Sequence, residues 1–143
     1  MVNTTIVSRF SGNLPLGRNR SRKIAGGPLY PAEEVLELLR VAGGQGVHAW
    51  TAKSISDTAE LELDAEDLFK LVQMAIKDGR FLGSQWCVQG RDGPWAACDA
   101  YSLVRSEWIP AAGKDMDIGY YIKFAIARTG KALLMVSCHL QGN

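Results

Sequence analysis

Hydrophobic residues recur every three or four positions between Pro31 and Gly79, and from Arg80 onward they alternate with polar ones. A helical period followed by a period of two predicts helices first and strands afterwards. Residues 1–29 are rich in Gly, Asn, Ser and Arg, show neither period, and predict a flexible basic arm. The pattern therefore predicts an arm, residues 1–29, and a domain, residues 30–143. The domain is expected to be α+β, with N-terminal helices packed on an antiparallel β-sheet meander.

Three helices and one short strand are expected before Gly79. Proline favours the first turn of a helix, glycine ends one, and aspartate caps the N-terminus. The elements and their signals are, in chain order, a helix opened by Pro31 and ended by Gly43-Gly44, a short strand at 47–51, a short helix at 54–61, and a third helix capped by Asp64 and ended by Gly79.

Four strands are expected after Gly79, at 80–88, 95–105, 119–127 and 132–140. The Arg128–Lys131 segment suits a three-residue hairpin turn with Gly130 in a left-handed conformation. That turn pairs Tyr121 with Ser137 and Lys123 with Met135. The resulting core face is wholly apolar and consists of Ile122, Phe124, Ile126, Leu134, Val136 and Cys138. The opposite face then carries Tyr121, Lys123, Ser137 and His139.

Composition narrows the class of protein. The chain has 143 residues, 47% hydrophobic and 22% charged, as in an ordinary globular domain. No apolar run approaches the ~20 residues of a membrane helix, and the first residues lack the basic and apolar regions of a signal peptide. The three cysteines share no CxxC spacing, so neither a disulfide framework nor a metal site is expected, and a reducing cytoplasm fits best.

Charge is unevenly distributed along the chain. Residues 1–30 contain five basic and no acidic side chains, residues 31–78 contain four basic and ten acidic, and residues 79–143 contain seven basic and five acidic. A basic arm and a mildly basic C-terminal half suit a polyanion such as nucleic acid. A solubilising tail is the simpler interpretation, and charge by itself does not separate the two.

The exposed sheet face carries groups that suit RNA. Metal-independent RNA cleavage needs a base for the ribose 2′-OH, a donor or cation for the phosphate, and an acid for the 5′-oxygen. Tyr121, Lys123 and His139 are side chains of these kinds, and Tyr101 and Arg105 on the 95–105 strand are expected to extend the face. Aromatic rings can also stack on unpaired bases. The same residue types are common on any solvated strand, so the pattern indicates only a small α+β domain compatible with RNA.

Ordered motifs add a more specific indication. They are Phe81…Ser84, Trp95…Asp99-x-Tyr101, Tyr121-Ile-Lys-Phe-x-Ile and Leu-Leu-Met-Val-Ser at 133–137. In this order the chain, from about Pro31 to His139, resembles the MqsR (motility quorum-sensing regulator) toxins of type II toxin–antitoxin systems. The resemblance implies a RelE-like fold and a sequence-specific endoribonuclease that cleaves mRNA without a cofactor or metal. It also implies bacterial cytoplasm and inhibition by a cognate antitoxin protein.

The family's functional residues transfer only in part. Its tyrosine corresponds to Tyr121, but its second-strand lysine falls on Gly83 and its glutamine on Ala96, and a basic residue near the end of the last strand becomes His139. We therefore expect Tyr121 and His139 to transfer protons, because an imidazole titrates near neutral pH. The other expected residues are Gln85 as a further catalytic group and Arg80, Lys123, Arg105 and Tyr101 as RNA-binding groups.

Two alternatives stay open. In the first, the chain is a catalytically weakened relative that binds RNA or antitoxin without cleaving RNA. In the second, it is an interaction module whose sheet edge accepts a partner strand. The basic arm either folds against RNA or antitoxin, or is a passive tail.

Overall fold

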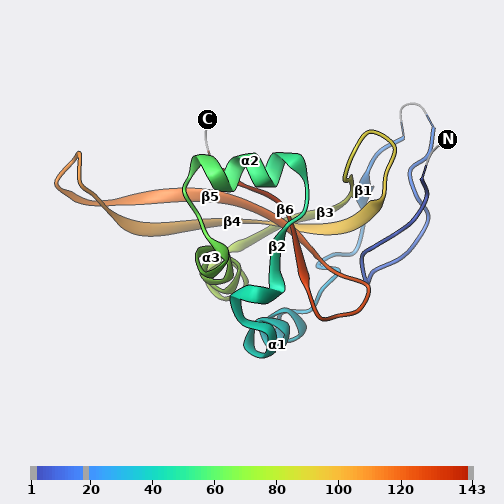
Figure 1. The fold of residues 1–143 in the computed structure, drawn as a ribbon, viewed down its shortest axis with the longest axis horizontal. Coiled ribbons are helices and arrows are strands. Elements are labelled where there is room, and N and C mark those ends of the chain that lie inside the picture. Colours follow the sequence, from blue (N-terminus) through green and yellow to red (C-terminus); the bar gives the residue numbers. More distant parts are fainter. Residues whose placement is uncertain (1–2, 18–19, 142–143) are drawn as a thin grey trace.

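The structure is a computed structural model that describes residues 3–17 and 20–141 (Figure 1). Within these residues, three α-helices and a six-stranded, mostly antiparallel sheet confirm the expected α+β class. The elements are, in chain order, β1 (Lys23–Ile24), α1 (Ala32–Ala42), the 3-10 helix η1 (Gly43–Gly46), β2 (Val47–Ala49), α2 (Ala52–Glu60), α3 (Ala65–Asp78), β3 (Arg80–Val88), β4 (Trp95–Ile109), β5 (Lys114–Ile126) and β6 (Leu133–Leu140).

The sheet is built around four strands in chain order. Its order is β1-β3-β4-β5-β6-β2; β2 runs parallel to β6 and the other pairs are antiparallel. Strands β4 and β5 are longer than the sequence predicted, because their ladder continues to the pair Ile109–Lys114. This β4–β5 hairpin projects beyond the helices at one end of the molecule (Figure 1).

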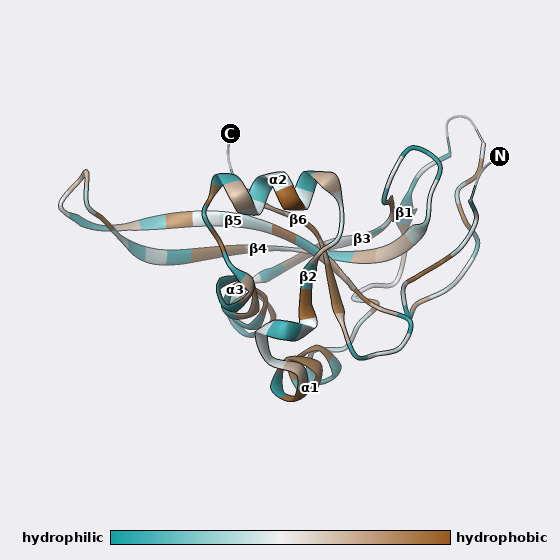
Figure 2. Cartoon of the chain, viewed as in Figure 1, coloured by the Kyte–Doolittle hydropathy of each residue, from teal (hydrophilic) through white to brown (hydrophobic). Residues whose placement is uncertain are grey.

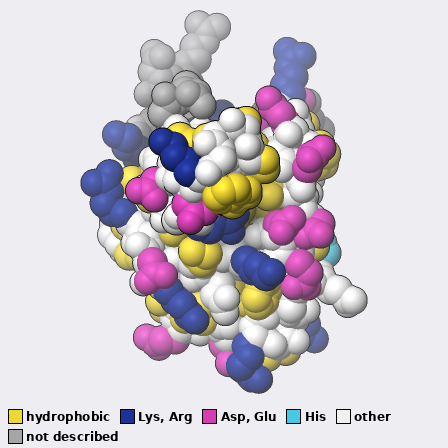
Figure 3. Space-filling view, turned by 90° about the vertical axis from the view of Figure 1, so that its left-hand side faces the viewer, with side chains coloured by type: hydrophobic (Ala, Val, Ile, Leu, Met, Phe, Trp, Pro, Cys, Tyr) yellow, Lys and Arg dark blue, Asp and Glu magenta, His cyan; other side chains and the backbone are white. Residues whose placement is uncertain are grey.

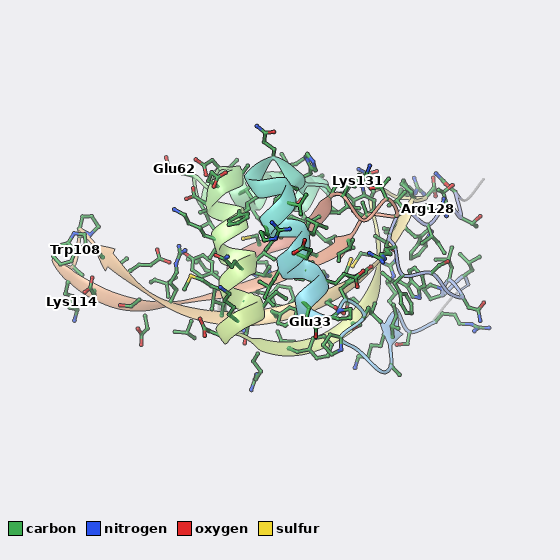
Figure 4. All side chains as sticks on the ribbon, turned by 90° about the horizontal axis from the view of Figure 1, so that it is seen from below. Glu33, Glu62, Trp108, Lys114, Arg128 and Lys131 are labelled. Atoms are coloured by element: carbon green, nitrogen blue, oxygen red, sulfur yellow. The ribbon has the colours of Figure 1, made fainter. Side chains whose placement is uncertain are left out.

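Helices α1 and α3 pack side by side against one face of the sheet, which we call the core face (Figure 4). Both helices alternate hydrophobic and hydrophilic residues along their length (Figure 2). The termini follow the predicted signals: Pro31 precedes α1, Gly79 ends α3, and the Asp64 carboxylate accepts a 2.9 Å hydrogen bond from the Asp67 amide. The main buried side chains of this layer are Val35, Leu39, Leu71, Val72, Leu103, Ile122, Phe124 and Cys138.

Helix α2 runs along β6, on the other side of the sheet ribbons from α1 and α3 (Figure 1). Thr51 caps it, and the same hydroxyl donates a 2.7 Å hydrogen bond to the Val136 carbonyl. Further along, the Asp57 carboxylate accepts a 3.3 Å bond from the Cys138 amide. These bonds satisfy polar groups of β6 and fix α2 at the margin of the second sheet face, which we call the outer face.

The predicted β5–β6 register is wrong. Tyr121 pairs with His139, and Lys123 pairs with Ser137. The loop holds four residues, 128–131, instead of three, and a bulge interrupts the β5–β6 ladder between Lys123 and Phe124. One extra loop residue shifts the pairing of the facing strand by one residue and so moves each of its side chains to the other face. The bulge then shifts the pairing by one residue more. Leu134 accordingly leaves the expected core face, and the fully buried positions are Leu133 and Met135.

The described part of the expected arm is attached to the sheet. The Val7 amide donates to the Trp95 carbonyl at 2.9 Å, and the Arg9 amide donates to the Ile126 carbonyl at 2.8 Å. Ser8 between them is buried, and β1 adds an edge strand to β3. Strand β1 therefore lies within residues 1–29, where the sequence shows neither period. The residues of this segment that pack against the Trp86–Trp95 cluster are Ile6, Phe10, Leu14, Ile24 and Leu29.

Candidate nucleic-acid interface

Five of the seven predicted site residues lie on the outer face. Paired residues in an antiparallel ladder point to the same side of the sheet, so the register defines two rows of neighbours. One row runs Arg80, Ser102, Tyr121 and His139, and the next runs Gly83, Ala100, Lys123 and Ser137. Gln85 follows on β3, opposite Cys98.

Tyr121 and His139 form a stacked pair. Their ring centroids are 5.0 Å apart and their planes differ by 18°. They are direct cross-strand partners, whereas the sequence predicted a diagonal pair. The His139 Nδ1 lies 3.0 Å from the Leu140 carbonyl oxygen, which can only accept a hydrogen bond. That contact assigns the N–H to Nδ1 and makes Nε2 the nitrogen able to accept a substrate proton.

Two hollows lie on the outer face and share Gln85. The first has a volume of about 450 Å³ and includes Tyr121, Gly83 and Lys23 among its lining residues. The second has a volume of about 270 Å³ and includes Lys123. Among the described residues that line them, the charged side chains are Lys23, Arg22, Lys53 and Lys123, and none is Asp or Glu. Such a surface attracts phosphate.

Acidic groups lie at the margins of the outer face. On the α2 side, Glu60 and Asp57 line a third hollow together with His139. Along the β4–β5 hairpin, Asp115 pairs with Trp108, an exposed residue at the projecting end. Figure 3 looks onto that end, where acidic, basic and hydrophobic side chains lie together. Carboxylates therefore lie on the α2 side of the outer face and at the hairpin, and within residues 3–17 and 20–141 none lines the two hollows that hold the basic residues.

Tyr101 does not belong to this face. Its side chain is 6% exposed, stacks on Phe124 with centroids 5.9 Å apart, and meets the edge of Phe81. Burial raises the pKa of Tyr101 to about 12. The prediction that it binds RNA is wrong because odd-numbered positions of β4 point toward α1 and α3.

Arg105 lies on the same side as Tyr101, beyond the helices. Its guanidinium donates to the Glu107 carboxylate at 3.1 Å and to the Tyr120 hydroxyl at 3.4 Å. It also lies over the Tyr120 ring, 5.3 Å from the centroid. The expectation that Arg105 extends the face of Tyr121 is therefore wrong, since the two residues lie on opposite faces of the hairpin.

Asp99 is a structural residue of the core face. It is fully buried and accepts three hydrogen bonds: 3.0 Å from the Leu29 amide, 3.0 Å from the Tyr30 amide and 2.6 Å from the Ser84 hydroxyl. A buried carboxylate so fully bonded holds the end of the arm against the sheet.

Cys87 contributes an unexpected group to the second hollow. A hydrogen bond with Cys98 lowers the pKa of Cys87 to about 6, and the positive charge of Lys123 acts in the same direction. Burial raises the pKa of Cys98. The lowered pKa, beside Lys123, sets Cys87 apart from the other two cysteines, whose pKa values are raised. Sequence reasoning missed Cys87, Lys23 and Glu60 as residues of this region, because none lies in a recognisable motif.

No family model, curated protein or solved structure matches the chain. Across the part of the chain that the structure describes, no cluster of three or more His, Cys, Asp or Glu side chains is placed to hold a metal ion. None of the described helices is both long and apolar enough to cross a membrane. The functional case rests on the chemistry of the outer face.

Proposed function

We propose that this protein is an MqsR-type toxin with a RelE-like fold, a metal-independent endoribonuclease that cleaves mRNA in bacterial cytoplasm and is inhibited by a cognate antitoxin. The observation that carries the proposal is the stacked Tyr121–His139 pair on the same face as hollows lined by Lys23 and Lys123. Groups able to move protons and groups able to hold phosphate thus lie on one open face.

The reaction is an internal transesterification. The ribose 2′-oxygen attacks phosphorus, a 2′,3′-cyclic phosphate forms, and the bond from phosphorus to the 5′-oxygen breaks. His139 Nε2 accepts the 2′-OH proton, and the Tyr121 hydroxyl donates a proton to the leaving 5′-oxygen. The Gln85 amide and the Lys123 ammonium stabilise the negative charge on the phosphoryl oxygens.

Unpaired RNA fits this surface better than a duplex does. Single strands can place their bases against rings and their phosphates against a cationic groove. Ala100, a small residue, lines the first hollow between Tyr121 and Gln85 and leaves room for a base beside the Tyr121 ring. Arg80, in the same row as Tyr121, extends the positive charge toward the β3 edge.

One observation favours a second candidate, an RNA- or antitoxin-binding relative that has lost cleavage. Gly83 and Ala96 bear no functional side chain at the positions where the resemblance places a lysine and a glutamine. Such a protein keeps the cationic groove and binds RNA with strong salt dependence, but it leaves the strand intact.

Induced expression in a bacterium, followed by incubation of the purified protein with mRNA in the presence of EDTA, tests the proposal. We expect growth arrest and RNA fragments that end in 2′,3′-cyclic phosphate and 5′-hydroxyl. The double variant Tyr121→Phe/His139→Gln should lose both effects, whereas Arg40→Gln on α1 should keep them. RNA binding without cleavage supports the second candidate. Cleavage by the double variant at the wild-type rate rejects the assignment of the pair.

A further inference from the structure

The hollow beside Tyr121 receives no charge from β3. Gly83 lines it without a side chain, its φ is +146°, and a Cβ built there would have open space around it. Leu82, which forms a bulge in β3 just before Gly83, is apolar and 40% exposed. A phosphate in this hollow therefore needs its cation from another element.

Strand β1 places a lysine at this hollow. Lys23 pairs with Gln85 and Ile24 with Ser84, and the Arg22 carbonyl accepts a 2.8 Å hydrogen bond from the Trp86 amide. Because cross-strand partners point to the same face, the Lys23 side chain follows Gln85 onto the outer face. Lys23 is exposed and lines the hollow with Gln85, Gly83 and Tyr121.

We propose that Lys23 is a phosphate-binding residue of the RNA site, an inference that rests on the proposed function. Among the described residues it makes no ion pair, and no described carboxylate lines its hollow. An ammonium group of this kind binds phosphate oxygens through charge and up to three N–H donors.

Lys23 and Lys123 hold different phosphates. They lie on β1 and β5, with β3 and β4 between them, so the two strands are about 14 Å apart across the sheet at ordinary strand spacing. Both lysines lie on the same side of the row that contains Tyr121 and His139, and Gln85 lies on a strand between them, so a single strand held by both runs beside that row. The N-terminal segment thus belongs to the substrate groove.

The binding test uses a single-stranded RNA methylated at every ribose 2′-oxygen, which can bind but cannot be cleaved. Fluorescence anisotropy against salt is measured for wild type, Lys23→Gln, Lys23→Arg and the matched control Lys77→Gln on α3. We expect Lys23→Gln to weaken binding roughly 3- to 10-fold at low salt and to reduce the slope of log K against log salt by about 0.7. Lys23→Arg should restore both the affinity and the salt slope, and Lys77→Gln should match wild type in both.

Cleavage of unmodified RNA by the same proteins separates binding from folding. Lys23→Gln should raise KM more than it lowers kcat while its melting temperature stays at the wild-type value. If wild type binds and cleaves RNA but Lys23→Gln has the same affinity, the same salt dependence of binding and the same KM, the inference about Lys23 is overturned and the proposed function stands. If wild type neither binds nor cleaves RNA, the proposed function itself is rejected.

Discussion

The ring of Tyr121 is stacked on the imidazole of His139 because the two residues face each other directly across the β5–β6 ladder. Lys123 approaches the same ring, with its Nζ 5.9 Å from the Tyr121 centroid. Tyr121 therefore has two separable parts, a ring that holds its neighbours in place and a hydroxyl able to give a proton. Substitutions that remove one part at a time distinguish these roles.

Tyr121→Phe should keep RNA binding and lose cleavage, while Tyr121→Ala should lose both. Removing a general acid typically lowers the rate 10²- to 10⁴-fold. Losing the ring as well should cost about 1 to 3 kcal/mol of binding to unpaired RNA. Single-turnover cleavage and anisotropy with 2′-O-methylated RNA measure the two effects. Equal cleavage by Tyr121→Phe and wild type would remove the hydroxyl from the mechanism.

The outer face was predictable from sequence despite the wrong register. The expected pairing of Tyr121 with Ser137 and the observed pairing with His139 differ by two residues, and a shift of two preserves the face of every side chain. At Leu134 the pairing is shifted by one residue, so the prediction that Leu134 lies on the core face is wrong. Caps were predictable too, because Pro31 and Asp64 act through their immediate neighbours.

Other parts of the site had no sequence signal. Strand β4 is buried on both faces from Trp95 to Tyr101, so it lacks the alternation that would have shown which face carries Tyr101 and Arg105. Strand β1 is two residues long and has no readable period. Its place beside β3, and with it the position of Lys23, depends on long-range packing of the N-terminal segment.

Asp99→Asn should destabilise the fold strongly. The carboxylate accepts bonds from two backbone amides and the Ser84 hydroxyl in a fully buried place, and an amide side chain replaces one acceptor with a donor. We expect a loss of about 2 to 4 kcal/mol in the free energy of unfolding. Ser84→Ala removes only one donor and should cost about 1 kcal/mol. Urea unfolding followed by tryptophan fluorescence compares the two variants.

Ser8→Ala should loosen the N-terminal segment. The buried Ser8 hydroxyl accepts a 2.9 Å bond from the Ala97 amide and donates a 2.7 Å bond to the Phe10 carbonyl. Its loss leaves the Ala97 amide unsatisfied, at a cost of about 1 to 3 kcal/mol. Amide exchange should accelerate at Ala97 and Val7 but not within α3. Unchanged exchange throughout would mean that the segment is held by its apolar contacts alone.

Cys87 should react with iodoacetamide at unusually low pH. Only the thiolate attacks, so the rate follows the ionised fraction, which rises through the pKa of about 6. Burial and the charge of Asp57 raise the pKa of Cys138 to about 12, so that thiol stays protonated at neutral pH. Peptide mass spectrometry after short exposure at pH 5 to 9 should therefore find alkylation at Cys87 with a midpoint near pH 6.

The cause of this low midpoint can be tested in two variants. Cys98→Ala removes the neighbouring hydrogen bond, the largest of the effects that lower the pKa, and Lys123→Met removes the nearby positive charge. Each should move the midpoint to higher pH, and Cys98→Ala should move it further. Bound 2′-O-methylated RNA should slow alkylation in the wild type, because Cys87 and Lys123 line the same hollow. Full reactivity at saturating RNA would exclude this part of the outer face from the RNA-binding surface.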